Sequence, residues 1–94
     1  MTGPEAKIEK RCVELARDKG WLTIKCDKIN RSWPDQEFIG PERRCFFVEF
    51  KVPGEQPREQ QDDRIADLRS LGHTVYVCDS FDEFVTLFAI ECAF

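Results

Sequence analysis

Asp35, Glu49 and Lys51 are the residues whose types and spacing could carry out chemistry in this chain. Glu49 and Lys51 stand two apart in a run, residues 45–51, whose other members are almost all aromatic or β-branched. Residues two apart on a strand point to the same face. A carboxylate and an ammonium among apolar neighbours are costly unless they pair or bind a metal. The two residues therefore form either a structural ion pair or part of a metal site.

Asp35 favours the metal site. It follows Pro34 directly and lies 14 residues before Glu49. Taken alone it could be an ordinary turn aspartate. However, residues 40–43 predict a hairpin turn, and hairpin pairing can bring positions 35–36 beside positions 49–50. Two carboxylates with water are a usual protein environment for Mg²⁺, and a metal held there could activate a water and polarise a phosphate.

Alternating helices and strands must position these residues. Apolar residues recur at helical spacing in three segments, with Pro4 suited to a first turn and Gly20 and Gly72 suited to helix ends. The order α-β-β-β-α-β-α predicts an α/β fold, a mixed sheet flanked by helices. We expect helices at residues 4–19, 57–71 and from Asp79 or Ser80 to about residue 92, and strands at 21–26, 36–39, 45–51 and 73–78.

A right-handed crossover through the second helix should pair the last two strands in parallel. The apolar side chains of the last two helices should face the sheet. These are Ile65, Leu68 and Leu71 in one helix and Phe81, Phe84, Val85, Leu87 and Phe88 in the other.

Length and composition limit the possible classes of protein. The 94 residues fit one domain, residues 1–94, and the five cysteines, odd in number and without CxxC spacing, suggest reduced, buried side chains. The net charge of −4 argues against a protein that passively coats DNA, but it leaves open an enzyme whose carboxylates a metal neutralises. The chain has no apolar run long enough for a membrane span and begins without a signal-peptide core. We therefore expect a cytoplasmic protein that is not secreted.

The arrangement Pro34-Asp35, a 13-residue gap and Glu49-Phe50-Lys51 resembles the PD-(D/E)XK nuclease superfamily. Further features along residues 4–88 make the chain similar to the VRR-NUC family (virus-type replication-repair nucleases) in its stand-alone viral form. The resemblance implies a restriction-endonuclease-like sheet. The additional features are Glu5 and Glu9 in the first helix, Gln60 and Gln61 at the start of the second, then Leu68, Gly72 and the strand at 75–77.

The resemblance also implies roles for single residues. Asp35, Glu49 and the backbone carbonyl of Phe50 would bind Mg²⁺, with Mn²⁺ also accepted. Lys51 would orient or deprotonate the attacking water, or stabilise the developing charge. Glu5 would be the acid of the first helix near the metal, with Glu9 as its alternative. Gln61 would be the helix glutamine, with Gln60 as its alternative.

The expected substrate is DNA. The chain has no recognisable base-reading module, which predicts cutting selected by DNA structure. Short viral members of the family resemble Holliday-junction resolvases, which implies a four-way or branched DNA substrate in the host cytoplasm. Trp33 would stack on an unpaired base or fill a hydrophobic gap. The cations expected to contact phosphates are Lys25, Lys28, Arg31, Arg43 and Arg44.

Two symmetric cuts in a junction require two active sites, so we expect a C₂ homodimer. The last helix, with Phe81, Phe84, Phe88, Ile90 and Phe94, is the expected interface unless it closes the monomer core. Two other functions stay open. One is a less selective nuclease that acts on flaps or ends, and the other is a non-catalytic module that binds DNA or protein.

Overall fold

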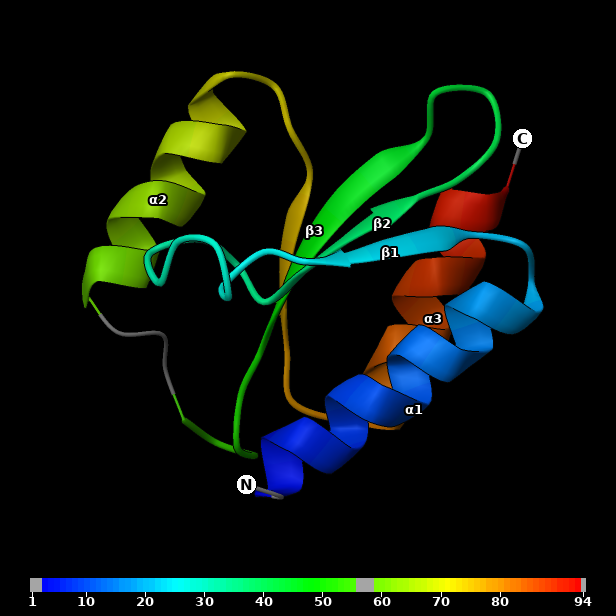
Figure 1. The fold of residues 1–94 in the computed structure, drawn as a ribbon, viewed down its shortest axis with the longest axis horizontal. Helices are drawn as coiled ribbons and strands as arrows, with labels where there is room; N and C mark the ends of the chain where they lie inside the picture. Colours follow the sequence, from blue (N-terminus) through cyan, green and yellow to red (C-terminus); the bar gives the residue numbers. More distant parts are fainter. Residues whose placement is uncertain (1–2, 56–58, 94) are drawn as a thin grey trace.

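The structure is a computed structural model that describes residues 3–55 and 59–93, with the side chains of residues 59–61 outside the description. The described residues form three helices and a four-stranded sheet in the predicted order (Figure 1). The elements are α1 (Pro4–Asp18), β1 (Leu22–Lys25), β2 (Gln36–Ile39), β3 (Cys45–Phe50), α2 (Glu59–Ser70), β4 (Val75–Cys78) and α3 (Phe81–Cys92).

The sheet has the strand order β1-β2-β3-β4. β1 pairs antiparallel with β2, and β2 pairs antiparallel with β3. β3 and β4 run parallel and are joined through α2, as predicted. Helices α1 and α3 lie together on one face of the sheet, and α2 lies on the other (Figure 1). The mixed, helix-flanked sheet expected from the sequence is confirmed.

Strand β3 supplies side chains to both faces because successive residues alternate. Phe46, Val48 and Phe50 enter the main core under α1 and α3. Phe47 enters a smaller core under α2. Glu49 shares the face of Phe47, and at 2% exposure it is one of two buried polar or charged residues among those described. Strand β3 therefore holds the carboxyl group of Glu49 in a buried position.

Two expectations about the apolar sides of the helices are wrong. Leu71 is 75% exposed, because α2 ends at Ser70 and Leu71 lies in the turn that follows. Val85 is 42% exposed, because the buried stripe of α3 runs through Phe84, Leu87 and Phe88 and Val85 lies about a quarter of a turn from Phe84.

The aromatic side of α3 closes the monomer core. Phe84 and Phe88 are 0% and 5% exposed, so these two rings are not available for the dimer interface predicted for them. Ile90 is 62% exposed, and Phe94 lies outside the described residues. Of the two expected caps, Ser80 is the one used: its hydroxyl accepts a hydrogen bond from the Glu83 backbone N–H over 3.1 Å.

All five cysteines are unpaired in the structure. Cys12, Cys26 and Cys78 are buried as expected, whereas Cys45 and Cys92 are only half-buried. Over residues 3–55 and 59–93, no helix combines the length and the apolar character that a membrane crossing needs.

Candidate active site

The register of the β2–β3 hairpin brings Asp35 to Glu49. Gln36 lies opposite Val48 in the ladder, so the residue before Gln36 meets the residue after Val48. Asp35 is held on both sides: its carboxylate accepts a hydrogen bond from the Phe50 N–H over 2.8 Å, and its carbonyl accepts one from the Cys26 N–H over 2.9 Å. The predicted convergence of the two acids across the hairpin is confirmed.

Glu49 and Lys51 form an ion pair on the face that they share. Lys51 Nζ lies 3.0 Å from Glu49 Oε2, and the two side chains are 11% and 2% exposed. The other oxygen of Glu49, Oε1, is buried and has no hydrogen-bond partner among the described residues. A buried carboxylate oxygen without a donor is costly. The ion pair therefore satisfies half of Glu49 and leaves the other half open to a cation.

A pocket of about 270 Å³ surrounds these residues and contains five carboxylic acids and two lysines. The N-terminal half of α1 forms one side of it, and the segment after β1 contributes a further acid. The lining residues are Glu5, Ala6, Glu9, Lys25, Asp27, Asp35, Glu49, Phe50 and Lys51.

Two more carboxylate oxygens in this pocket lack a hydrogen bond within the described part of the chain, Glu5 Oε2 and Asp27 Oδ1. Asp27 Oδ1 lies 3.3 Å from Lys25 Nζ. The two groups therefore form an ion pair, but they are not oriented for a hydrogen bond. Three such oxygens around one pocket match the hard-oxygen preference of Mg²⁺. Among residues 3–55 and 59–93, however, no three Asp, Glu, His or Cys side chains are placed to surround one ion. An ion held by Asp35 and Glu49 would therefore be completed by backbone and water oxygens, with Glu5 beside those waters in the same pocket.

Burial dominates the electrostatics of the two acids. Burial and then the charge of Glu49 together raise the pKa of Asp35 to about 8, against the hydrogen bond from the Phe50 amide. Burial also raises the pKa of Glu49, although the hydrogen bond and charge of Lys51 oppose this. The site therefore favours a bound proton in the absence of a cation, and a divalent ion would displace it.

The structure divides the predicted DNA-binding cations into two groups. Lys25, Lys28 and Arg31 line a second polar pocket of about 450 Å³ together with Asp27, and this pocket shares Lys25 and Asp27 with the first. Arg43 and Arg44 lie at the β2–β3 turn, at the opposite end of the hairpin from Asp35.

Arg44 donates a hydrogen bond to the Glu91 carbonyl at the end of α3. The predicted surface therefore consists of a group beside the site and a separate group at the far end of the sheet.

Trp33 fills a hydrophobic gap, which was one of the two expectations for it. Its ring lies 5.9 Å from the ring of Phe47 and packs against the core under α2. The guanidinium of Arg64 lies 5.6 Å from the ring centroid. Gln60 and Gln61 belong to the first turn of α2, but their side chains lie outside the described residues.

Sequence reasoning missed Asp27 and the contacts of Lys25. Lys25 and Asp27 stand two apart at the end of β1, the same spacing of opposite charges that drew attention to Glu49 and Lys51. That repeated spacing was the available signal. Nothing local in the sequence shows that the end of β1 adjoins Asp35.

Comparison with known proteins bears on the fold and the family. No family model matches the chain. A protein of Acyrthosiphon pisum secondary endosymbiont phage 1, named "Putative nuclease p44", is 39% identical over 79 residues, which are 83% of this chain and 85% of that protein. A solved structure named "VRR_NUC domain" superimposes with a TM-score of 0.84 at 27% identity, covering 92% of this chain and 95% of the other. With this sequence identity, this fold and these acids at one pocket, the chain belongs to the VRR-NUC family of nucleases.

Proposed function

We propose that the protein is a metal-dependent deoxyribonuclease that hydrolyses phosphodiester bonds in branched DNA. The observation that carries the proposal is the meeting of Asp35 and Glu49 across the hairpin, with Glu49 Oε1 buried and lacking a hydrogen bond within the described chain. A buried acid pair of this kind is costly in a protein without a cation to bind. A bound metal ion would offset the energetic cost of burying the two acids.

Asp35, Glu49 and the carbonyl of Phe50 would hold the ion, Mg²⁺ with Mn²⁺ accepted, because all three offer oxygen ligands. When bound, the ion supplies a Lewis acid for the scissile phosphate and lowers the pKa of a water. Asp35 is kept in place by the Phe50 amide, so the protein positions this ligand before the metal arrives.

Lys51 supplies positive charge beside the metal position. Its side chain is 11% exposed, so solvent screens the ammonium little, and Nζ is held 3.0 Å from Glu49 Oε2. A preorganised charge in a water-poor site stabilises charge that develops on a phosphate. Lys51 is also proposed to orient the attacking water or, in its neutral amine form, to accept a proton from it. Glu5, which lines the pocket from α1, is proposed to complete the site. Gln61 of α2, with Gln60 as its alternative, is proposed to contribute as well.

Lys28 and Arg31 are proposed to bind the phosphates next to the scissile one, because their pocket adjoins the catalytic pocket.

A Holliday junction is the favoured branched substrate, and the phage origin of the relative supports a viral protein that acts in the host cytoplasm. A C₂ homodimer would supply the two sites that paired cuts need. With Phe84 and Phe88 in the core, Val85 and Ile90 are the large apolar side chains that the described part of α3 exposes to a partner.

The test is cleavage of a labelled four-way junction, a flap and a linear duplex in Mg²⁺, in Mn²⁺ and in EDTA. Asp35→Asn is compared with Asp18→Asn, which removes an exposed acid from the end of α1 and serves as the matched control. We expect symmetric junction cleavage that EDTA and Asp35→Asn abolish and Asp18→Asn preserves. Equal cleavage of all three substrates would replace the junction proposal with a less selective flap or end nuclease. No metal-dependent cleavage would leave the non-catalytic module.

A further inference from the structure

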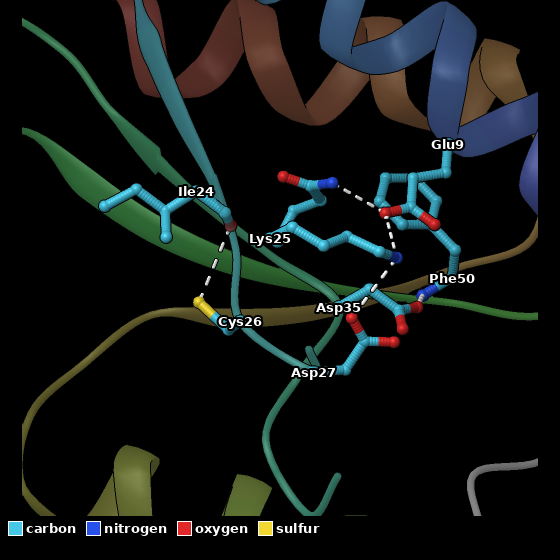
Figure 2. Close-up of polar contacts among 8 residues, drawn as sticks. Glu9, Ile24, Lys25, Cys26, Asp27, Asp35 and Phe50 are labelled. Carbon is cyan, nitrogen blue, oxygen red and sulfur yellow. Dashed lines mark hydrogen bonds and ion pairs between the residues drawn. The ribbon is translucent and has the colours of Figure 1, made fainter. Parts of the chain in front are cut away.

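Glu9 joins α1 to two strands of the sheet through one oxygen atom. Glu9 Oε2 accepts a hydrogen bond from Lys25 Nζ over 2.7 Å and another from Gln36 Nε2 over 2.7 Å (Figure 2). Lys25 belongs to β1 and Gln36 to β2. We call these three residues the α1 clamp.

The clamp is shielded from solvent at two of its three residues. The side chain of Glu9 is 13% exposed and Gln36 is 7% exposed, whereas the side chain of Lys25 is 36% exposed. Burial lowers the pKa of Lys25, but the hydrogen bond to Glu9 and the charges of Glu9, Asp35 and Asp27 together outweigh burial, so the net shift is upward and the ammonium stays charged. Charge-assisted hydrogen bonds between partly buried groups are stronger than those on the surface. The clamp therefore restrains α1 against the sheet.

The clamp lies one helical turn from Glu5. Residues four apart on a helix share a face, so Glu5 and Glu9 project toward the same pocket. The N-terminus of α1 has no side-chain cap from Gly3, and the fully buried residues of α1 are Cys12 and Ala16, further along the helix. Apolar packing is most complete in the second half of α1, although Ile8 is half-buried against the same core. The clamp adds a polar contact to the sheet in the half of α1 that carries Glu5.

The clamp also separates the roles of the two helix acids. One oxygen of Glu9 is already occupied by two donors, whereas Glu5 Oε2 is buried without a hydrogen bond among the described residues. We propose that Glu9 is a positioning residue, which acts with Lys25 and Gln36 to hold Glu5 at the metal pocket. It follows that Lys25 serves the clamp and is not a phosphate contact. This inference rests on the proposed metal-dependent function.

The experiment measures Mn²⁺ affinity by calorimetry without DNA, together with the melting temperature, so it does not depend on cleavage. Removing the acid in Glu9→Ala should weaken Mn²⁺ binding about ten-fold, as loss of a group that orients a metal site does. Loss of negative charge alone would also weaken Mn²⁺ binding. Glu9→Ala is therefore compared with a second variant that breaks the clamp by removing a positive charge. Lys25→Met is this variant, because it breaks the same contact and removes a positive charge. It also releases Asp27, which lies 3.3 Å from Lys25 Nζ. Gln36→Leu, which breaks the clamp without a change of charge, is therefore measured beside it and should also weaken binding.

The two explanations predict opposite signs for Lys25→Met. Loss of a cation beside the pocket would by itself tighten Mn²⁺ binding, whereas loss of the clamp weakens it. We expect weaker binding in Lys25→Met and recovery in the charge-exchanged pair Glu9→Lys with Lys25→Glu. Glu14→Gln, an exposed acid on the same helix, is the control and should bind as the wild type does.

Unchanged or tighter binding in Lys25→Met would overturn the positioning role, even if the melting temperature fell. If Glu9→Ala does not fold, Lys25→Met and the exchanged pair still decide the question. A wild-type protein that binds neither Mn²⁺ nor Mg²⁺ would overturn the proposed function, and the clamp's role with it. Binding by the wild type with no loss in Lys25→Met would overturn the clamp alone.

Discussion

The carboxylate of Asp35 accepts a hydrogen bond from the backbone amide of Phe50 over 2.8 Å, just beyond the last paired residues of β2 and β3. Phe50 follows Glu49, so the position of the first acid depends on the backbone that carries the second. The hydrogen bond favours the charged form of Asp35, while burial and the charge of Glu49 favour the protonated form more strongly. The backbone amide of Phe50 thus fixes the position of Asp35, while burial beside Glu49 makes the charged form of Asp35 energetically unfavourable.

Removing the charge of Asp35 should abolish activity and stabilise the metal-free protein. Asp35→Asn keeps an oxygen that can accept from the Phe50 amide, but it loses a charged metal ligand. We expect kcat/KM to fall by about 10³-fold or more, since a metal supplies several kcal/mol of transition-state stabilisation. In EDTA at about pH 8 the variant should melt above the wild type, because it buries no second charge. A lower melting temperature there would contradict this account.

Stability of the metal-free protein should fall as pH rises from about 4 to about 8. The folded-state pKa of Asp35 is raised from 3.8 to about 8, so the native state binds the proton more tightly than the unfolded state. That contribution is fully present below the ordinary pKa and is lost as pH rises through the folded pKa. Urea unfolding in EDTA across this range measures it. Asp35→Asn should flatten the profile, and an equally steep profile in that variant would assign the effect to other groups.

Mn²⁺ affinity should change with pH in the opposite direction, strengthening as pH rises toward about 8, because the ion competes with the proton on Asp35. Calorimetry at several pH values measures this, with proton release that appears as a dependence on buffer. Affinity that does not vary with pH would mean that the ion does not displace this proton.

Lys51→Met should destabilise the fold as well as the reaction. It leaves the Glu49 carboxylate, 2% exposed, without its ion-pair partner, and breaking a buried pair costs about 3–5 kcal/mol. Glu49→Gln combined with Lys51→Met should recover much of this stability while remaining inactive. Chemical denaturation of the single and double variants measures the coupling. A double variant no more stable than Lys51→Met would show that the two side chains are not energetically coupled.

The two groups of cations should differ in DNA binding. Replacing Lys28 and Arg31 with Ala should lower junction affinity and reduce the slope of log K against log salt by about 0.9 for each lost phosphate contact. Arg43→Ala, at the far end of the hairpin, should leave the slope unchanged. Binding measured in the Asp35→Asn background avoids cleavage. An equal effect of Arg43→Ala would extend the DNA path to that end of the sheet.

Ser80→Ala tests the fold apart from the site. Loss of the cap on α3 should cost about 1 kcal/mol, which corresponds to about 4–8 °C in melting temperature for a domain of this size. Mn²⁺ affinity should not change, because Ser80 does not line the catalytic pocket. A change in affinity would show that the site senses the stability of α3.

The sequence by itself determined the order of the elements and the meeting of Asp35 with Glu49. Both follow from local rules: two-residue alternation puts Glu49 and Lys51 on one face, and a turn at residues 40–43 sets the register of the strands that flank it. These features depend on residues that are neighbours along the chain or across one hairpin.

Only the tertiary structure decided which acid of α1 accepts hydrogen bonds from the sheet and which apolar side chains stay exposed. Glu5 and Glu9 share a helix face, and the docking of α1 gives Glu9 to Lys25 and Gln36. Phe84 and Phe88 suggested a dimer surface, yet the sheet buries them in the monomer. Asp27 lines the same pocket as Asp35 because the segment after β1 lies beside Asp35. These outcomes depend on long-range packing between elements, which the local periodicity of a sequence does not encode.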